Sequence, residues 1–265
     1  MDLKQHFIHH EPFYLPVADE IQHFCAAYES RVPILLKGPT GCGKTRFVEH
    51  LAWKLQKPLI TISCHEDMTA SDLTGRFLLK DDSTEWQDGP LTLAAKFGAI
   101  CYLDEIVEAR QDTTVVIHQL TDHRRTLSLE KTNEVIEAHK DFLLIMSYNP
   151  GLQHSQKELK ASTKQRFCAL NFDYPNFKAE VEILERHSRV DLIVAEQIVR
   201  LGQSTRRIQD YKLLHGASTR MLIHASKLIS NGLSFSDACR LAIVEPITED
   251  EETKSALMAC IAALG

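Results

Sequence analysis

The chain has 265 residues, of which 44% are hydrophobic and 25% charged, and its formal net charge is -6. These values are typical of a globular protein that can bury a sizeable core. The acidic balance disfavours a dedicated nucleic-acid-binding protein, which usually carries a strongly basic face. No run of 18 apolar residues occurs, so we expect no membrane contact. Seven cysteines without a C-x-x-C pair favour reduced thiols and a cytoplasmic location.

Short apolar runs alternate with helical patterns up to Tyr174-Pro175. Runs of this length, separated by helices, predict buried parallel strands in a doubly wound α/β sheet. Beyond Pro175 the pattern is helical, so we predict an α/β domain over residues 1–175 and an all-helical domain over residues 176–265. The five candidate strands cover residues 32–37, 58–64, 99–103, 142–147 and 167–172.

Two polar segments interrupt the α/β pattern, at residues 76–90 and 124–139. In the second, β-branched and apolar residues flank a polar turn, which is typical of a β-hairpin. The first has the composition of a hairpin or an exposed loop. In the helical part, Thr248 followed by Glu251 has the spacing of a capping box and predicts a helix start.

A glycine-rich turn follows the first candidate strand and matches the pattern G-x-x-x-x-G-K-[ST]. Glycines allow the backbone N–H groups to surround phosphates, and the helix that follows adds its positive dipole end. The lysine can reach the β- and γ-phosphates of ATP, and the threonine hydroxyl can bind Mg²⁺. The loop comprises Gly38, Pro39, Thr40, Gly41, Cys42, Gly43, Lys44 and Thr45.

The third candidate strand ends at two adjacent carboxylates, Asp104 and Glu105. After a phosphate-binding loop, this pair predicts a Mg²⁺ ligand in Asp104 and a base for the attacking water in Glu105. Asn149 ends the next strand and would lie at the same edge of a parallel sheet, where it could orient that water. The alternative for Asn149 is a turn residue, because Asn-Pro-Gly is also a good turn.

Together these motifs resemble the AAA+ superfamily over nearly the whole chain. The resemblance implies a P-loop domain with a central parallel sheet, followed by a helical lid domain. It also implies that Arg166, just before the fifth strand, acts as an arginine finger on a neighbouring subunit's ATP. Arg220, in the sequence GASTR, resembles the sensor 2 arginine that contacts the γ-phosphate of ATP bound to its own subunit. The rival fingers are Arg110, Arg124 and Arg125.

The two interrupting segments resemble the helix-2 insert and the pre-sensor-1 hairpin, which places the chain near the MoxR branch. The sequences GPTGCGKT, DLTGR, WQDGP and YLDEI further resemble the CbbQ/NorQ group, and CbbQ most of all. This resemblance implies a hexameric ring that reactivates inhibited Rubisco with a CbbO-like partner bearing a von Willebrand factor A domain. A NorQ-like role in maturing nitric oxide reductase is the alternative.

Two further interpretations remain open from the residues alone. A small P-loop phosphotransferase would need no ring and no second carboxylate to activate water, and the paired arginines argue against it.

The segment Leu78–Asp82 carries two leucines at an exposed tip and is a candidate contact for a client protein. Its neighbours Phe77 and Trp86 would then either bind the client or pack under their own hairpin.

Overall fold

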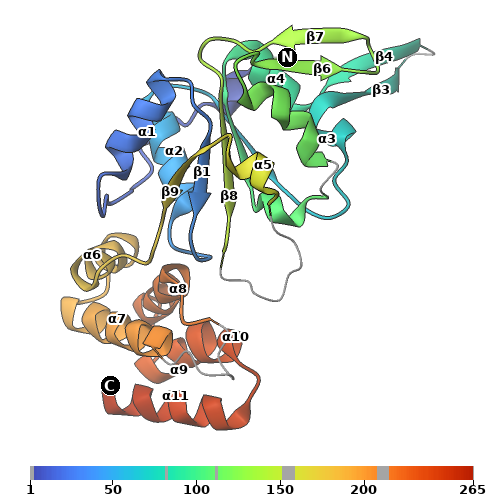
Figure 1. Cartoon of the computed structure of the whole chain (residues 1–265). Helices are drawn as coiled ribbons and strands as arrows, with labels where there is room; N and C mark the ends of the chain where they lie inside the picture. Colours follow the sequence, from blue (N-terminus) through green and yellow to red (C-terminus); the bar gives the residue numbers. More distant parts are fainter. Residues whose placement is uncertain (1–2, 81–82, 111–112, 151–158, 208–214, 265) are drawn as a thin grey trace. The chain divides into compact units, whose positions relative to one another are not determined.

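The computed structural model describes residues 3–80, 83–110, 113–150, 159–207 and 215–264. The chain forms two compact units (Figure 1). Residues 1–38 and 44–172 make up the first unit, and residues 39–43 and 173–265 make up the second. Within the described residues, no helix is both long enough and apolar enough to cross a membrane.

A five-stranded parallel sheet is the centre of the first unit, with strand order β2-β5-β8-β1-β9 (Figure 1). The predicted α/β fold with a parallel sheet is therefore confirmed. β1, which leads into the glycine-rich turn, lies between β8 and β9, and β5, which leads into the two carboxylates, lies between β2 and β8. The strands are β1 (Ile34–Lys37), β2 (Leu59–Ser63), β5 (Ile100–Asp104), β8 (Leu143–Tyr148) and β9 (Cys168–Asn171).

Side chains that alternate along the strands pack against helices on both faces of the sheet. On one face, α4 (Pro90–Phe97) contributes buried leucines and alanines to a core shared with Leu35, Leu103 and Met146. On the other, Phe47 of α2 (Lys44–Lys54) packs its ring 5.6 Å from that of Phe24 on α1 (Glu20–Glu29). Burial on both faces explains why the three central strands, β1, β5 and β8, read as continuous apolar runs.

An antiparallel hairpin occupies each of the two segments that interrupt the α/β pattern. β3 (Gly75–Lys80) pairs with β4 (Ser83–Asp88), and β6 (Thr126–Leu129) pairs with β7 (Glu134–Glu137). Figure 1 shows both hairpins at the same end of the first unit. The remaining short elements of this unit are η1 (Leu3–His6), α3 (Ala70–Thr74), η2 (Ile106–Glu108), η3 (Thr113–Thr121) and α5 (Ala161–Lys164).

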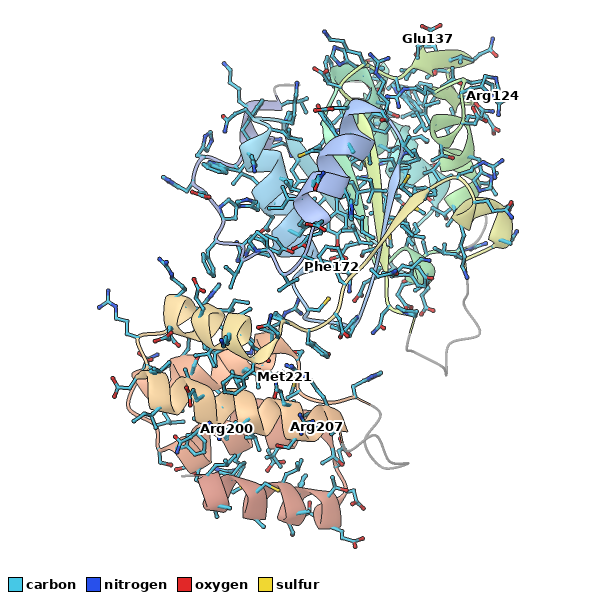
Figure 2. The ribbon with its side chains drawn as sticks, turned by 60° about the vertical axis from the view of Figure 1, so that its left-hand side comes forward. Arg124, Glu137, Phe172, Arg200, Arg207 and Met221 are labelled. Carbon is cyan, nitrogen blue, oxygen red and sulfur yellow. The ribbon has the colours of Figure 1, made fainter. Side chains whose placement is uncertain are left out.

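The part of the second unit that follows residue 173 is helical where described. A buried apolar cluster that includes Leu184, Leu222 and Ile243 holds the helices together. Figure 2 shows Arg200 and Arg207 on α7 and Met221 on α8. The helices are α6 (Phe177–His187), α7 (Leu192–Arg207), α8 (Thr219–Ser230), α9 (Phe235–Cys239), η4 (Arg240–Val244), α10 (Glu245–Ile247) and α11 (Glu251–Leu264).

The start of α11 differs from the predicted capping box. The carboxylate of Asp250 accepts a hydrogen bond from the N–H of Thr253 at 2.9 Å, so Asp250 caps the helix. The Thr248 hydroxyl instead accepts from the N–H of Asp250 at 3.1 Å. The Thr248–Glu251 prediction was wrong because a second good capping residue lies two positions further on, directly before the helix.

Candidate active site

The glycine-rich turn joins the end of β1 to the first residue of α2, and backbone space is tight at its start. A Cβ atom on Gly38 would lie 2.5 Å from the carbonyl oxygen of Phe172, so no larger residue fits there. Gly43 has φ +104°, a conformation that L-residues rarely adopt, and nothing lies within 4 Å of where its Cβ would be. The loop is therefore shaped by its glycines, and the space beside Gly43 is open.

Lys44 supplies the positive charge of this loop. Its residue exposure is 9%, and its Nζ donates a hydrogen bond to the Gly38 carbonyl oxygen at 2.7 Å. The first turn of α2 contains no acidic residue that would offset the helix dipole. A cationic side chain held across an open loop at a helix N-terminus is an arrangement suited to phosphate groups.

The carboxylate of Asp104 lies at the end of β5 and is held by three hydroxyl groups. Its Oδ1 accepts from Tyr102 Oη at 2.7 Å and from Ser147 Oγ at 2.5 Å. Its Oδ2 accepts from Thr45 Oγ1 at 3.3 Å. Thr45 and Asp104 thus present adjacent hard oxygen ligands of the kind that Mg²⁺ prefers, so the donor set fits this ion.

Glu105 adopts an unusual backbone conformation directly after the strand. Its φ and ψ are 55° and 48°, in the left-handed region, where a non-glycine residue is strained. The side chain is exposed, and the backbone N–H donates to Ser147 Oγ at 3.0 Å. The Glu105 side chain is therefore accessible to solvent while its backbone is attached to β8.

Two neighbouring acidic groups, the Cys64 thiol and the Tyr102 hydroxyl, stay protonated at neutral pH. Burial, and then the charges of Asp104 and Glu105, raise the pKa of the Cys64 thiol to about 12. Burial and the Asp104 charge likewise raise the pKa of Tyr102. Tyr102 is therefore a neutral hydrogen-bond donor to Asp104 at neutral pH.

The other predicted site residues of the first unit are Asn149 and Arg166, which lie after β8 and before β9. Asn149 follows β8 and is half-buried, two residues beyond Ser147. Arg166 lies in the turn between α5 and β9 and donates from Nη1 to the carbonyl of Ser162. Ser147 and Tyr102, which contact Asp104, were not among the predicted site residues. Their only signal in the sequence is a hydroxyl near the end of an apolar strand.

The rival arginine fingers have structural partners. Arg124 forms an ion pair with Asp122 at 2.5 Å. Arg125 donates from Nη2 to the carbonyl of Phe142 at 3.0 Å and so braces the chain around β8. Both arginines bond within their own subunit, as Arg166 does through Ser162, so these contacts do not rank the candidate fingers.

In the second unit, Arg220 is exposed on the first turn of α8, and hydrogen bonds hold Ala217 and Thr219, which precede it. Buried Glu180 of α6 forms an ion pair with Arg206 of α7 at 2.7 Å and accepts from Thr219 Oγ1 at 2.6 Å. The Arg206 Nε donates to the carbonyl of Ala217 at 2.7 Å. These bonds fix the backbone on which Arg220 stands.

The tip of the β3–β4 hairpin exposes apolar side chains. Leu79 is 83% exposed and Phe77 46% exposed. Phe77 and Trp86 pack edge to face with ring centroids 5.2 Å apart, and Trp86 Nε1 donates to Asp88 at 2.8 Å. Of the candidate client-contact segment, Asp81 and Asp82 lie outside the described residues.

The parallel sheet, the loop at its switch point and the carboxylate pair beside Thr45 define a P-loop ATPase of the AAA type. Consistent with this class, the family model for the AAA domain (dynein-related subfamily) matches residues 33–167. A putative ATPase from Cytophaga hutchinsonii has a similar fold, with a TM-score of 0.55 at 18% identity over 94% of this chain and 90% of that one.

Sequence relatives narrow the class further. The model for the CbbQ/NirQ/NorQ C-terminal region matches residues 180–264. Protein CbbQ of Hydrogenophilus thermoluteolus is 56% identical over 100% of this chain and 99% of its own length. NirQ of Pseudomonas aeruginosa is 52% identical over 93% and 95%, and NorQ of Paracoccus denitrificans is 51% identical over 96% and 94%. The chain therefore belongs to the CbbQ/NirQ/NorQ group of MoxR-type AAA+ ATPases.

Proposed function

We propose that this ATPase is the motor subunit of a ring, a hexamer, that reactivates inhibited Rubisco together with a CbbO-like partner carrying a von Willebrand factor A domain. The observation that supports a hydrolytic motor is the juxtaposition of Thr45, Asp104 and Glu105 beside the Lys44 loop. The choice of Rubisco as client rests on similarity to CbbQ along the full chain.

In this proposal, the backbone N–H groups of residues 38–45 and the Lys44 ammonium bind the phosphates of ATP. Thr45 and Asp104 would hold Mg²⁺, which when bound neutralises charge on the β- and γ-phosphates. Glu105 orients the attacking water and accepts its proton, since its exposed carboxylate projects beyond the strand end. Asn149, from the adjacent strand, assists in placing the water.

Two arginines complete the proposed machinery. Arg166 of one subunit reaches the ATP of its neighbour, so that hydrolysis requires a ring. Arg220 contacts the γ-phosphate of ATP in its own subunit and reports hydrolysis to the helical lid. We further propose that the two hairpins are the helix-2 insert and pre-sensor-1 hairpin, and that Leu78–Asp82 contacts the client.

The hydrolytic role is tested by Glu105→Gln. We expect ATP binding within about 3-fold of wild type and a turnover reduced at least about 100-fold, since general-base catalysis is worth roughly two to four powers of ten. Glu137→Gln, at the exposed end of β7 (Figure 2), is the matched control and should turn over ATP normally. Normal turnover by Glu105→Gln would show that Glu105 is not the base.

The client is tested with inhibitor-bound Rubisco. Purified protein and its CbbO-like partner should restore carboxylation with ATP, and the Glu105→Gln variant should not. The alternative is a NorQ-like role in maturing nitric oxide reductase. It is supported by the sequence identities to NirQ and NorQ, which are only slightly lower than the identity to CbbQ. Restoration of nitric oxide reductase activity, with none of Rubisco, would decide for that client.

A further inference from the structure

We infer that Ser147 is a positioning residue that couples the two catalytic carboxylates, fixing Asp104 through its side chain and Glu105 through its backbone. Tyr102 also supports Asp104, and its hydroxyl interacts with Ser147 and Thr45 as well. This inference rests on the proposed function, because it assigns Asp104 to Mg²⁺ and Glu105 to the attacking water. It concerns residues of the chain itself and is tested first without nucleotide or metal.

The direction of each hydrogen bond at Ser147 follows from the chemistry of its partners. The Glu105 N–H can only donate, so Ser147 Oγ accepts it at 3.0 Å. The Asp104 carboxylate can only accept, so the single hydroxyl proton of Ser147 goes to Oδ1 at 2.5 Å. One side chain therefore joins both acidic residues, and rotating its proton away would break the bond to Asp104.

Burial makes this arrangement rigid. Ser147 and Tyr102 both have 0% exposure, so a lost bond cannot be replaced readily by bulk water. Because both donate to Oδ1, the other carboxylate oxygen, Oδ2, is the one directed at Thr45. The hydroxyl pair thus decides which oxygen of Asp104 is available to a metal ion.

The bond to Glu105 has a separate role. The left-handed conformation of Glu105 is strained for a non-glycine residue and persists only where surrounding structure holds it. The Ser147 Oγ supplies such a hold from the neighbouring strand β8. Without it, the turn could relax and move the Glu105 carboxylate away from the position it needs for the attacking water.

Tyr102 provides a matched comparison. Its Oη donates to Asp104 Oδ1 at 2.7 Å, whereas the Glu105 N–H bonds Ser147. Tyr102→Phe therefore removes a support of the metal ligand, whereas Ser147→Ala removes a support of both carboxylates. The two variants differ in the Glu105 N–H bond, which is the contact that the inference requires.

The first test is hydrogen exchange of the Glu105 amide, measured by NMR on protein free of nucleotide and Mg²⁺. We expect exchange at least about 10-fold faster in Ser147→Ala and within about 3-fold of wild type in Tyr102→Phe. Ser147→Thr, which keeps the hydroxyl, should retain protection. Equal protection in wild type and Ser147→Ala, with both folded by circular dichroism, would overturn the coupling.

The second test separates the effect of the Asp104 bond from that of the Glu105 bond during ATP hydrolysis. Tyr102→Phe should raise the Mg²⁺ concentration for half-maximal rate. Ser147→Ala should in addition lower kcat at saturating Mg²⁺ at least 10-fold, and a 10-fold loss corresponds to an activation free energy about 1.4 kcal/mol higher. Equal kcat values for the two variants would overturn the role of the Glu105 bond. Normal turnover by Glu105→Gln would instead refute the proposed base, while the exchange result would still decide the Ser147 contact. If Ser147→Ala does not fold, Ser147→Cys, a poorer donor and acceptor, takes its place in both tests.

Discussion

Replacement of Glu180 by Gln should destabilise the helical unit strongly. Glu180 is completely buried, and its two oxygens accept from Arg206 Nη2 at 2.7 Å and Nη1 at 2.9 Å. Its Oε1 also accepts from Thr219 at 2.6 Å. The amide keeps the shape but removes the charge, so Arg206, with a side-chain exposure of 14%, remains buried without its counter-charge.

Breaking a buried ion pair by removing one partner costs about 3–5 kcal/mol. Gln retains one acceptor oxygen, so we expect a loss near the lower limit, about 3 kcal/mol. The assay is denaturant-dependent hydrogen exchange of peptides spanning α6, α7 and α8. The chain has two tryptophans, Trp53 and Trp86, both in the first unit, and their fluorescence should report unchanged unfolding there.

The matched control is Glu196→Gln, which removes the partner of Arg200 on the exposed face of α7 (Figure 2). This pair spans 3.3 Å with side-chain exposures of 61% and 37%, so its loss should cost at most about 0.5 kcal/mol. A loss below about 1 kcal/mol for Glu180→Gln, equal to that of the control, would refute the reasoning from burial.

Three further outcomes follow from the structure. Arg166→Ala should remove ring ATPase but spare nucleotide binding, and mixing with Lys44→Ala subunits should restore activity if Arg166 acts in trans; no restoration argues against a finger. The Lys57 hydrogen bond holds the pKa of Asp141 below its usual range, so this pair stabilises the fold above about pH 4 and less as pH falls through the folded pKa. Asp141→Asn should therefore lower Tm at pH 7 more than at pH 3, whereas a pH-independent difference would contradict the shift. Leu222→Ala, at 0% exposure, should cost about 2–5 kcal/mol in denaturant unfolding, and a loss below 1 kcal/mol would mean that the cavity collapses.

Local motifs carried the prediction of the phosphate-binding loop and of the Asp104–Glu105 pair. Both depend on residues adjacent in the chain, and the physical demands on a phosphate loop are short-range. The apolar runs predicted all five strands of the sheet, and the signal is clearest for β1, β5 and β8, because strands buried on both faces contain little polar sequence. The roles of the loop residues, of the Asp104–Glu105 pair and of Asn149, Arg166 and Arg220 stay predictions.

The Thr248 cap shows where such local reasoning ends. Thr248 and Asp250 are both good capping residues, and the choice between them depends on how the preceding chain approaches α11. The hairpin aromatics Phe77 and Trp86 were likewise open between client binding and self-packing. Their ring contact required the register of β3 against β4, which sequence periodicity alone does not specify.

The sequence by itself determined the class of fold and predicted the phosphate loop and the acidic pair, because hydrophobic periodicity and contiguous motifs are written along the chain. Only the tertiary structure showed that Ser147, from a strand distant in sequence, contacts both Asp104 and Glu105. Only it paired Glu180 with Arg206 across two helices. Such contacts depend on strand register and side-chain direction, which are decided by packing of the whole unit.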